Sequence, residues 1–219
     1  MFIGHWSAAF VAATHPKAPR LPVLFLAAQF IDWLFFLFVL LGVEKMRIVK
    51  GLTEVSPLDL YYMPWTHSMV GALCWGATFG GCVWLITKNR VGALIAGAVV
   101  FSHWLLDLLV HRADLTLAGG DAKFGLGLWN NAAIEMPLEL GLTGCAIWIY
   151  ASRSRAVAKP WAIWALIAFL LVLQLYNWFA PVPPEVDAAT PILGLVAYGL
   201  VTALAAWVSR NREMKRDAK

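Results

Sequence analysis

Three side chains that can bind a metal ion, His103, Asp107 and His111, recur at four-residue intervals. At 3.6 residues per turn this spacing places them on one face of a helix, within an arc of about 80°. They belong to or directly follow an apolar run, residues 91–110, that is long enough to cross a bilayer. A charge at mid-membrane costs roughly 2.5–3.5 kcal/mol on insertion scales, so Asp107 needs a partner. No Lys or Arg stands beside His103 or Asp107, and a divalent cation such as zinc suits both imidazole and carboxylate ligands.

Further ionisable side chains interrupt apolar runs at a similar depth. Counted at 1.5 Å per residue from the nearest basic turn, His5, Asp32 and Glu139 fall within about one helical turn of His103 in depth, in the outer half of the bilayer. Singly, each has an ordinary interpretation as an interfacial histidine, a helix cap or a first-turn carboxylate. Because ionisable residues inside a membrane are functional candidates by default, we predict one shared metal site. Its predicted ligands are His5, Asp32, His67, His103, Asp107, His111 and Glu139.

The composition indicates an integral membrane protein. Of the 219 residues, 61% are hydrophobic and 14% are charged, against averages of about 45–50% and about 25% in globular proteins. Six apolar runs qualify as spans: residues 21–43, 66–87, 91–110, 132–151, 161–179 and 191–209. Residues 3–14 are apolar but too short to cross, which indicates a half-helix or an interfacial helix. We therefore predict an all-α transmembrane helical bundle of about six helices, a single domain over residues 1–219 with a basic tail at 210–219.

Basic residues predict the orientation. Of the 17 Lys and Arg residues, 12 lie on the face that holds the C-terminus and 5 on the opposite face. The five are Lys45, Arg47, Lys50, Arg112 and Lys123. By the positive-inside rule the C-terminus is cytoplasmic, and the long loops 44–65 and 112–131 lie outside.

The order of the candidate ligands carries a resemblance. Gly4-His5, Asp32, Thr66-His67-Ser68 and Ser102-His103-x-x-x-Asp107 resemble the bacterial inner-membrane family described as membrane-bound metal-dependent hydrolases (YdjM-like), over roughly residues 4–140. The resemblance implies a multi-pass protein of the bacterial inner membrane with metal-dependent hydrolase activity. One departure is that Met63-Pro64-Trp65 stands where this family has an Arg shortly before Thr-His-Ser.

The same order is similar to that of zinc-dependent phospholipase C and its nuclease relatives. This similarity implies that Asp32, His67, His103 and Asp107 hold one zinc, with Asp107 bridging to a second held by His111 and Glu139. The final pair is Glu135-x-x-x-Glu139, without a His, and the N-terminal residue is not the tryptophan of the soluble enzymes. We therefore expect one or two zinc ions rather than three.

A zinc ion with an open position lowers the pKa of a bound water to about 7 and polarises a phosphoryl or carbonyl oxygen. Glu135, a carboxylate not needed as a ligand, is a candidate general base, and bridging Asp107 is the second predicted catalytic residue. Because the site faces the outer leaflet, the expected substrate is a lipid or lipid-linked phosphoester. No nucleic-acid partner is expected.

Three alternatives stay open. An intramembrane zinc amidase similar to the ceramidase-type hydrolases is favoured by Ser102 beside His103, although the terminal His-x-x-x-His of that group is absent. A metal transporter needs polar groups along the whole depth, and residues 91–101 supply none. A non-catalytic protein with a structural metal site has the same ligands as an enzyme, and only an open coordination position distinguishes the two.

Overall fold

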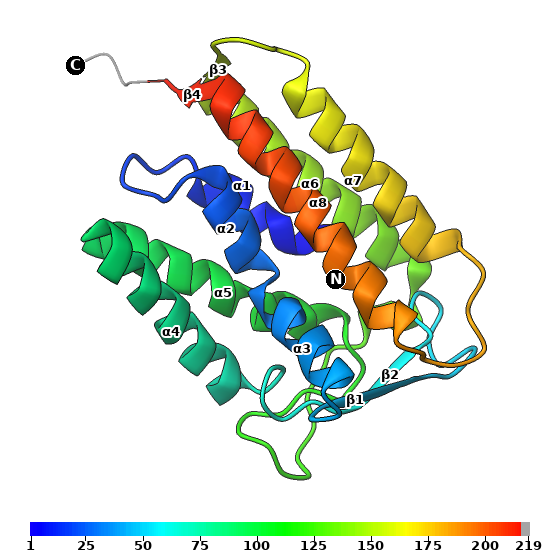
Figure 1. Cartoon of the computed structure of the whole chain (residues 1–219). Helices are drawn as coiled ribbons and strands as arrows, with labels where there is room; N and C mark the ends of the chain where they lie inside the picture. Colours follow the sequence, from blue (N-terminus) through cyan, green and yellow to red (C-terminus); the bar gives the residue numbers. More distant parts are fainter. Residues whose placement is uncertain (216–219) are drawn as a thin grey trace.

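The computed structural model of the chain describes residues 1–215, and its long elements are all helices (Figure 1). The helices are η1 (Ile3–His5), α1 (Trp6–Ala12), α2 (Leu21–Ala28), α3 (Phe30–Leu40), α4 (Met69–Thr87), α5 (Arg90–Val110), η2 (Leu128–Asn130), α6 (Ala132–Arg153), α7 (Ala162–Phe179) and α8 (Ala189–Asn211). The strands are β1 (Lys45–Ile48), β2 (Leu58–Tyr62), β3 (Ser154–Ala156) and β4 (Arg212–Met214). Arg216 and Lys219, part of the predicted basic tail, lie outside the described residues.

Within the described residues, five helices are long and apolar enough to cross a membrane, namely α4 to α8. The pair α2 and α3 makes a sixth candidate span if the two are counted together. These helices indicate a multi-pass membrane protein, and the predicted helical bundle is confirmed as a mostly helical fold. Two small antiparallel sheets, β1–β2 and β3–β4, were not predicted. They lie at opposite ends of the molecule (Figure 1), and β4 takes up residues 212–214 of the predicted tail.

The first predicted span, residues 21–43, is broken rather than continuous. The helix α2 ends at Ala28, α3 begins at Phe30, and the two axes differ in direction by 52°. Between them, Gln29 leaves the helical conformation with φ −106° and ψ 11°. Its side chain is fully buried and its Nε2 donates to the carbonyl oxygen of Phe2 at 3.1 Å. The break therefore lies where the chain meets its own N-terminal segment.

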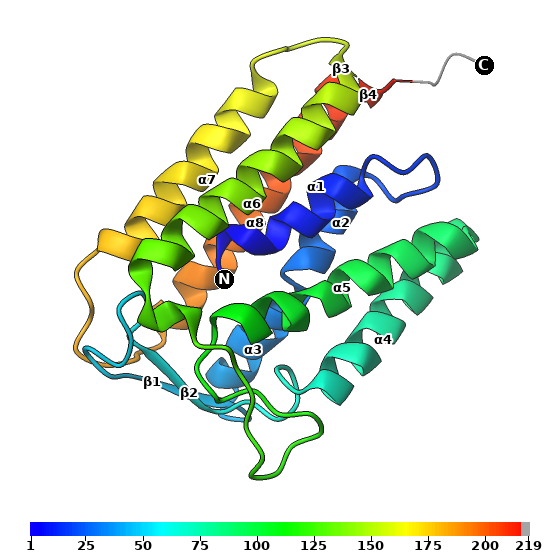
Figure 2. The ribbon, with the colours of Figure 1, turned by 180° about the vertical axis from the view of Figure 1, so that it is seen from behind.

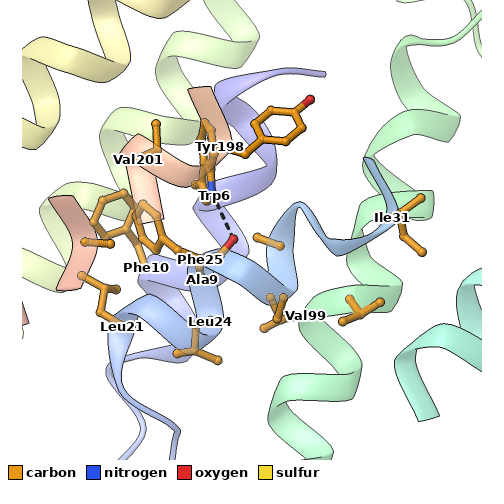
Figure 3. Packing of buried hydrophobic residues seen from close by; sticks show 14 of the residues in the cluster. Trp6, Ala9, Phe10, Leu21, Leu24, Phe25, Ile31, Val99, Tyr198 and Val201 are labelled. Carbon is orange, nitrogen blue, oxygen red and sulfur yellow. Dashed lines mark hydrogen bonds between the residues drawn. The ribbon is translucent and has the colours of Figure 1, made fainter. Parts of the chain in front are cut away.

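That N-terminal segment lies inside the bundle. Figure 2 shows α1 between α5 and α6, with the N-terminus near the middle of the molecule. Trp6 and Phe10 are fully buried, and the Nε1 of Trp6 donates to the carbonyl oxygen of Phe25 at 3.2 Å (Figure 3). Of the predicted segment 3–14, residues 3–12 are helical, and their position inside the bundle favours the half-helix of the two alternatives.

The helices α4 and α5 pack closely because glycines and an alanine line their contact. A Cβ atom added at Gly76 would lie 2.8 Å from the carbonyl oxygen of Gly97, and one at Gly80 would lie 2.8 Å from that of Ala93. Small residues of this kind allow backbones in a membrane to approach. At the start of α5, the Asn89 side chain accepts from the Gly92 N–H at 3.0 Å and caps the helix. This packing positions the helix that carries His103 and Asp107 and leads directly into His111.

Candidate metal centre

Six of the seven predicted ligands lie together in the folded chain. They are His5 from η1, Asp32 from α3, His67 from the turn before α4, His103 and Asp107 from α5, and His111 directly after α5. The four histidines and Asp107 are at most 2% exposed. Asp32 is the most accessible of the six, with 17% of its side chain exposed. Residues spread over more than a hundred positions therefore form one buried cluster.

Asp107 lies at the centre of the cluster, and its two carboxylate oxygens face different histidines. The Nε2 atoms of His5 and His111 lie 3.1 Å and 3.5 Å from Oδ1. The Nε2 atoms of His103 and His67 lie 3.1 Å and 3.7 Å from Oδ2. The carboxylate therefore stands between two pairs of imidazole nitrogens, as a bridging ligand would.

Asp32 supplies the second carboxylate. Its Oδ1 lies 3.4 Å from the Nε2 of both His67 and His103, and its Oδ2 accepts from the Tyr198 hydroxyl at 3.0 Å. Two overlapping triplets result, each with ligand atoms within 4.8 Å of one another: Asp32, His67 and His103, and His5, His103 and Asp107. Because His103 belongs to both triplets, it joins the two halves of the cluster.

A hydrogen bond at Nδ1 of His103 determines which of its two ring nitrogens carries the hydrogen. Its Nδ1 lies 2.9 Å from the carbonyl oxygen of Ala28, the last residue of α2 before the helix break. A carbonyl oxygen only accepts, so Nδ1 must carry a hydrogen. In the neutral ring the Nε2 lone pair then points at the carboxylates of Asp32 and Asp107. Metal-binding histidines in proteins are oriented in this way by a partner on the other ring nitrogen.

His67 and His111 have partners on Nδ1 as well. The Nδ1 of His67 lies 2.8 Å from the Thr66 hydroxyl, and that of His111 lies 2.9 Å from Oδ1 of Asp114. Burial lowers the pKa of His111, but the carboxylates of Asp107 and Asp114 outweigh this effect and raise its pKa above the usual value. The Nε2 atoms of both rings are again directed toward the central carboxylates.

This arrangement fits a divalent metal ion. Lone pairs on imidazole Nε2 atoms facing buried carboxylates repel unless a cation or added protons lie between them. Two carboxylates balance the charge of one divalent ion, and imidazole with carboxylate is a donor set that zinc accepts. The donor types, their orientation and their burial therefore agree with the predicted metal site.

The N-terminal segment brings two further groups to the cluster. The His5 ring stacks on the His103 ring, with centroids 3.7 Å apart and planes 5° apart. The amino group of Met1 donates to Oδ1 of Asp107 at 2.9 Å, a contact that the sequence did not indicate. This half of the site therefore depends on how residues 1–5 are held.

Glu139 holds this segment and belongs to neither ligand triplet. Its Oε1 accepts from the backbone N–H groups of Phe2 at 2.6 Å and Gly4 at 2.9 Å, and its Oε2 accepts from Gln174 at 2.8 Å. Glu135, one turn earlier on α6, is fully buried, and among residues 1–215 neither of its carboxylate oxygens has a hydrogen-bond partner. Its predicted part as a general base stays a prediction.

Several groups that orient the ligands were not found from the sequence. Asp114 stands three residues after His111, and this short spacing could have indicated a contact between the two side chains. Glu44 and Tyr198 gave no such signal, because their contacts join residues 22 and 166 positions apart. The carbonyl of Ala28 became a candidate partner only once the break between α2 and α3 was known.

An apolar groove of about 390 Å³ lies beside the cluster, between α1, α5 and α6. Its lining includes Leu105, Leu106, Cys145 and Ala146. Ser102, the neighbour of the ligand His103, also lines it. The groove is therefore an apolar surface that includes the sequence neighbour of one candidate ligand.

Searches of family models, curated proteins and solved structures gave no match to this chain. The proposal that follows therefore rests on the geometry of the cluster and on the resemblance of its motifs.

Proposed function

We propose that this chain is a membrane-embedded, zinc-dependent hydrolase of phosphoester bonds in lipid or lipid-linked substrates, with its site in the outer half of the bilayer. One observation carries the proposal. His103, held by the Ala28 carbonyl through Nδ1, directs Nε2 at the carboxylates of buried Asp107 at 3.1 Å and partly exposed Asp32 at 3.4 Å. Such a site calls for a cation, and the order of the ligands resembles that of metal-dependent hydrolases.

The residues divide into two sets around Asp107. Asp32, His67 and His103 lie on the side of Oδ2, and His5 and His111 lie on the side of Oδ1. This division supports one or two ions with Asp107 shared between them. When bound, such ions acidify water and polarise a phosphoryl oxygen.

The groove between α5 and α6 supports a lipid-type substrate. Its lining is almost entirely apolar, and two of its walls are candidate membrane spans. Along α6 its lining runs from Leu142 to Ile149, toward the end predicted to be cytoplasmic. An acyl chain of an outer-leaflet lipid would run in this direction from a headgroup held at the cluster.

A structural metal site is the second candidate, and the burial of the ligands favours it. Four histidines and Asp107 are nearly inaccessible, so that protein groups alone have enough donors to saturate one ion. A catalytic zinc keeps an open position, whereas a structural zinc does not.

Metal analysis and substrate turnover on the purified full chain test the proposal. Protein in detergent, supplied with zinc, should contain about one or two ions per chain by elemental analysis, and His103→Ala should lose most of the metal. His15→Ala, at the predicted cytoplasmic turn, is the matched control and should retain it. Less than about 0.3 ion per chain in the unaltered protein would overturn the metal site.

The same preparation is then assayed in parallel against phospholipids, lipid-linked phosphates and N-acyl lipids. Metal-dependent release from a phosphoester supports the hydrolase. Release from the N-acyl lipid alone would move the assignment to the amidase. Full metal occupancy with no turnover of any of the three would favour the structural site.

A further inference from the structure

Glu44 is a buried carboxylate in an outer loop, between α3 and β1, and it is 1% exposed. Its Oε1 accepts from the backbone N–H groups of Trp65 at 2.8 Å and Thr66 at 3.0 Å. Its Oε2 accepts from the Thr66 hydroxyl at 2.6 Å. All of these carboxylate hydrogen bonds are therefore to the turn that carries His67.

The direction of the hydrogen bonds follows from what each group can donate. The Thr66 hydroxyl donates to Oε2 of Glu44, so its single hydrogen points to that carboxylate. The hydroxyl oxygen then presents a lone pair to the Nδ1 of His67 at 2.8 Å. Nδ1 must carry a hydrogen, which leaves Nε2 as the nitrogen that can bind a metal ion lying between it and the carboxylates of Asp32 and Asp107.

His67 needs this additional group because of the type of its immediate partner. His103 faces a backbone carbonyl and His111 faces a carboxylate, and both of these partners accept only. A hydroxyl both donates and accepts, so Thr66 alone leaves the His67 tautomer undetermined. By accepting the hydroxyl hydrogen of Thr66, Glu44 leaves that hydroxyl able only to accept from His67.

We propose that Glu44, acting through the Thr66 hydroxyl, is a positioning residue that holds His67 in the tautomer able to bind metal through Nε2. The proposal rests on the metal centre of the proposed function.

The substitution Glu44→Gln tests the relay. The two backbone N–H groups require an oxygen at the position of Oε1, so the new NH₂ group faces the Thr66 hydroxyl. The hydroxyl must then donate to the Nδ1 of His67, which moves the ring hydrogen to Nε2. We expect a loss of about 10–100-fold in zinc or cobalt affinity, as is typical when an outer partner of a metal ligand is changed.

Three further variants serve as controls. Thr66→Val removes the hydroxyl and should lose affinity, whereas Thr66→Ser keeps it and should bind like the unaltered chain. Glu54→Gln makes the same change on the same outer face, at an exposed carboxylate that accepts from the Ala132 N–H at 2.8 Å. It should leave affinity unchanged.

The state of the ring is read by NMR on the zinc-loaded full chain with ¹⁵N-labelled histidine. His67 should show a hydrogen on Nδ1 and a metal-bound Nε2 in the unaltered chain, and the metal-bound Nε2 signal should be lost or weakened in Glu44→Gln. Equal metal affinity and the same His67 signals in both proteins would overturn the inference while leaving the metal centre intact. Absence of metal binding in the unaltered chain would refute the proposed function instead.

Discussion

Asp107 is the residue on which the proposed site depends most, because its carboxylate lies at the centre of the cluster. Its two oxygens face four imidazole Nε2 atoms between 3.1 and 3.7 Å. An amide in its place keeps one oxygen, removes the negative charge and turns an NH₂ group toward two of those nitrogens.

We therefore expect Asp107→Asn to lose most of the bound metal and, with it, turnover. Glu135→Gln is the comparison: this side chain is equally buried, and its oxygens have no hydrogen-bond partner among residues 1–215, so metal content should stay near that of the unaltered chain. If Glu135 is the general base, the Gln variant loses turnover while keeping metal. Elemental analysis beside an activity assay separates the two results. Metal loss in Glu135→Gln and retention in Asp107→Asn would contradict these assignments.

At the scale of single elements, the N-terminal segment must be held in place for His5 to reach Asp107. The Oε1 of Glu139 accepts from the N–H groups of Phe2 and Gly4, so Glu139 holds the N-terminal backbone in place. The similarity to phospholipase C implies instead that it is a metal ligand.

Two substitutions distinguish the role of Glu139 as a backbone acceptor from a role as a metal ligand. Glu139→Gln keeps a side-chain oxygen for the two N–H groups, so metal content should change little. Glu139→Ala leaves buried N–H groups without an acceptor, which costs about 1–3 kcal/mol each, and should displace His5 and lower the metal content. Metal per chain is measured for both variants and for His5→Ala. Equal and complete loss in both Glu139 variants would support the ligand assignment.

The contact between α4 and α5 is a second feature at this scale, because it positions the helix that carries His103, Asp107 and the approach to His111. A Cβ atom at Gly97 would lie 2.8 Å from the carbonyl oxygen of Gly76, so Gly97→Ala forces the two backbones apart. We expect a loss of about 1–3 kcal/mol in the free energy of unfolding.

The matched control is Gly81→Ala on α4, where an added Cβ meets nothing within 4 Å. Alanine is favoured over glycine in helices by up to about 1 kcal/mol, so this variant should be as stable as the unaltered chain or more stable. Thermal unfolding in one detergent compares the two. A stable Gly97→Ala protein would show that the helices separate at little cost.

At the scale of the whole molecule, the orientation in the membrane determines which leaflet reaches the metal site. The candidate spans α4–α8 give six crossings if the bent pair α2–α3 is counted as one more span. The 12-against-5 distribution of basic residues predicts a cytoplasmic C-terminus. The β1–β2 hairpin, the loop 112–131 and Glu44 then lie on the outside, near the cluster.

A reporter that is active only in the cytoplasm should therefore work when fused after the C-terminus. The same reporter inserted at Gly119-Gly120, in the outer loop, should be inactive. The reverse result at both positions would place the site in the inner leaflet and exchange the compartment of the substrate. Activity at both positions would contradict six crossings.

Local patterns in the sequence determined the features that depend on neighbouring residues. The apolar runs predicted α4 to α8 because a bilayer requires about twenty apolar residues per helix. The four-residue spacing from His103 to His111 predicted one helical face, and counting from the basic turns predicted that His5, Asp32 and His103 lie at a common depth. These relations follow from helix geometry alone, and the cluster of six side chains agrees with them.

Only the tertiary structure decided the contacts between distant segments. The break at Gln29 adjoins the Ala28 carbonyl that faces His103, and there the Gln29 side chain donates to the distant Phe2 carbonyl. The same holds for Glu44 and Thr66, 22 residues apart, and for Glu139, whose oxygens accept from backbone groups near the N-terminus. A carboxylate at a given depth binds a metal or a backbone N–H equally well in principle, and packing in three dimensions determines which of these groups it reaches.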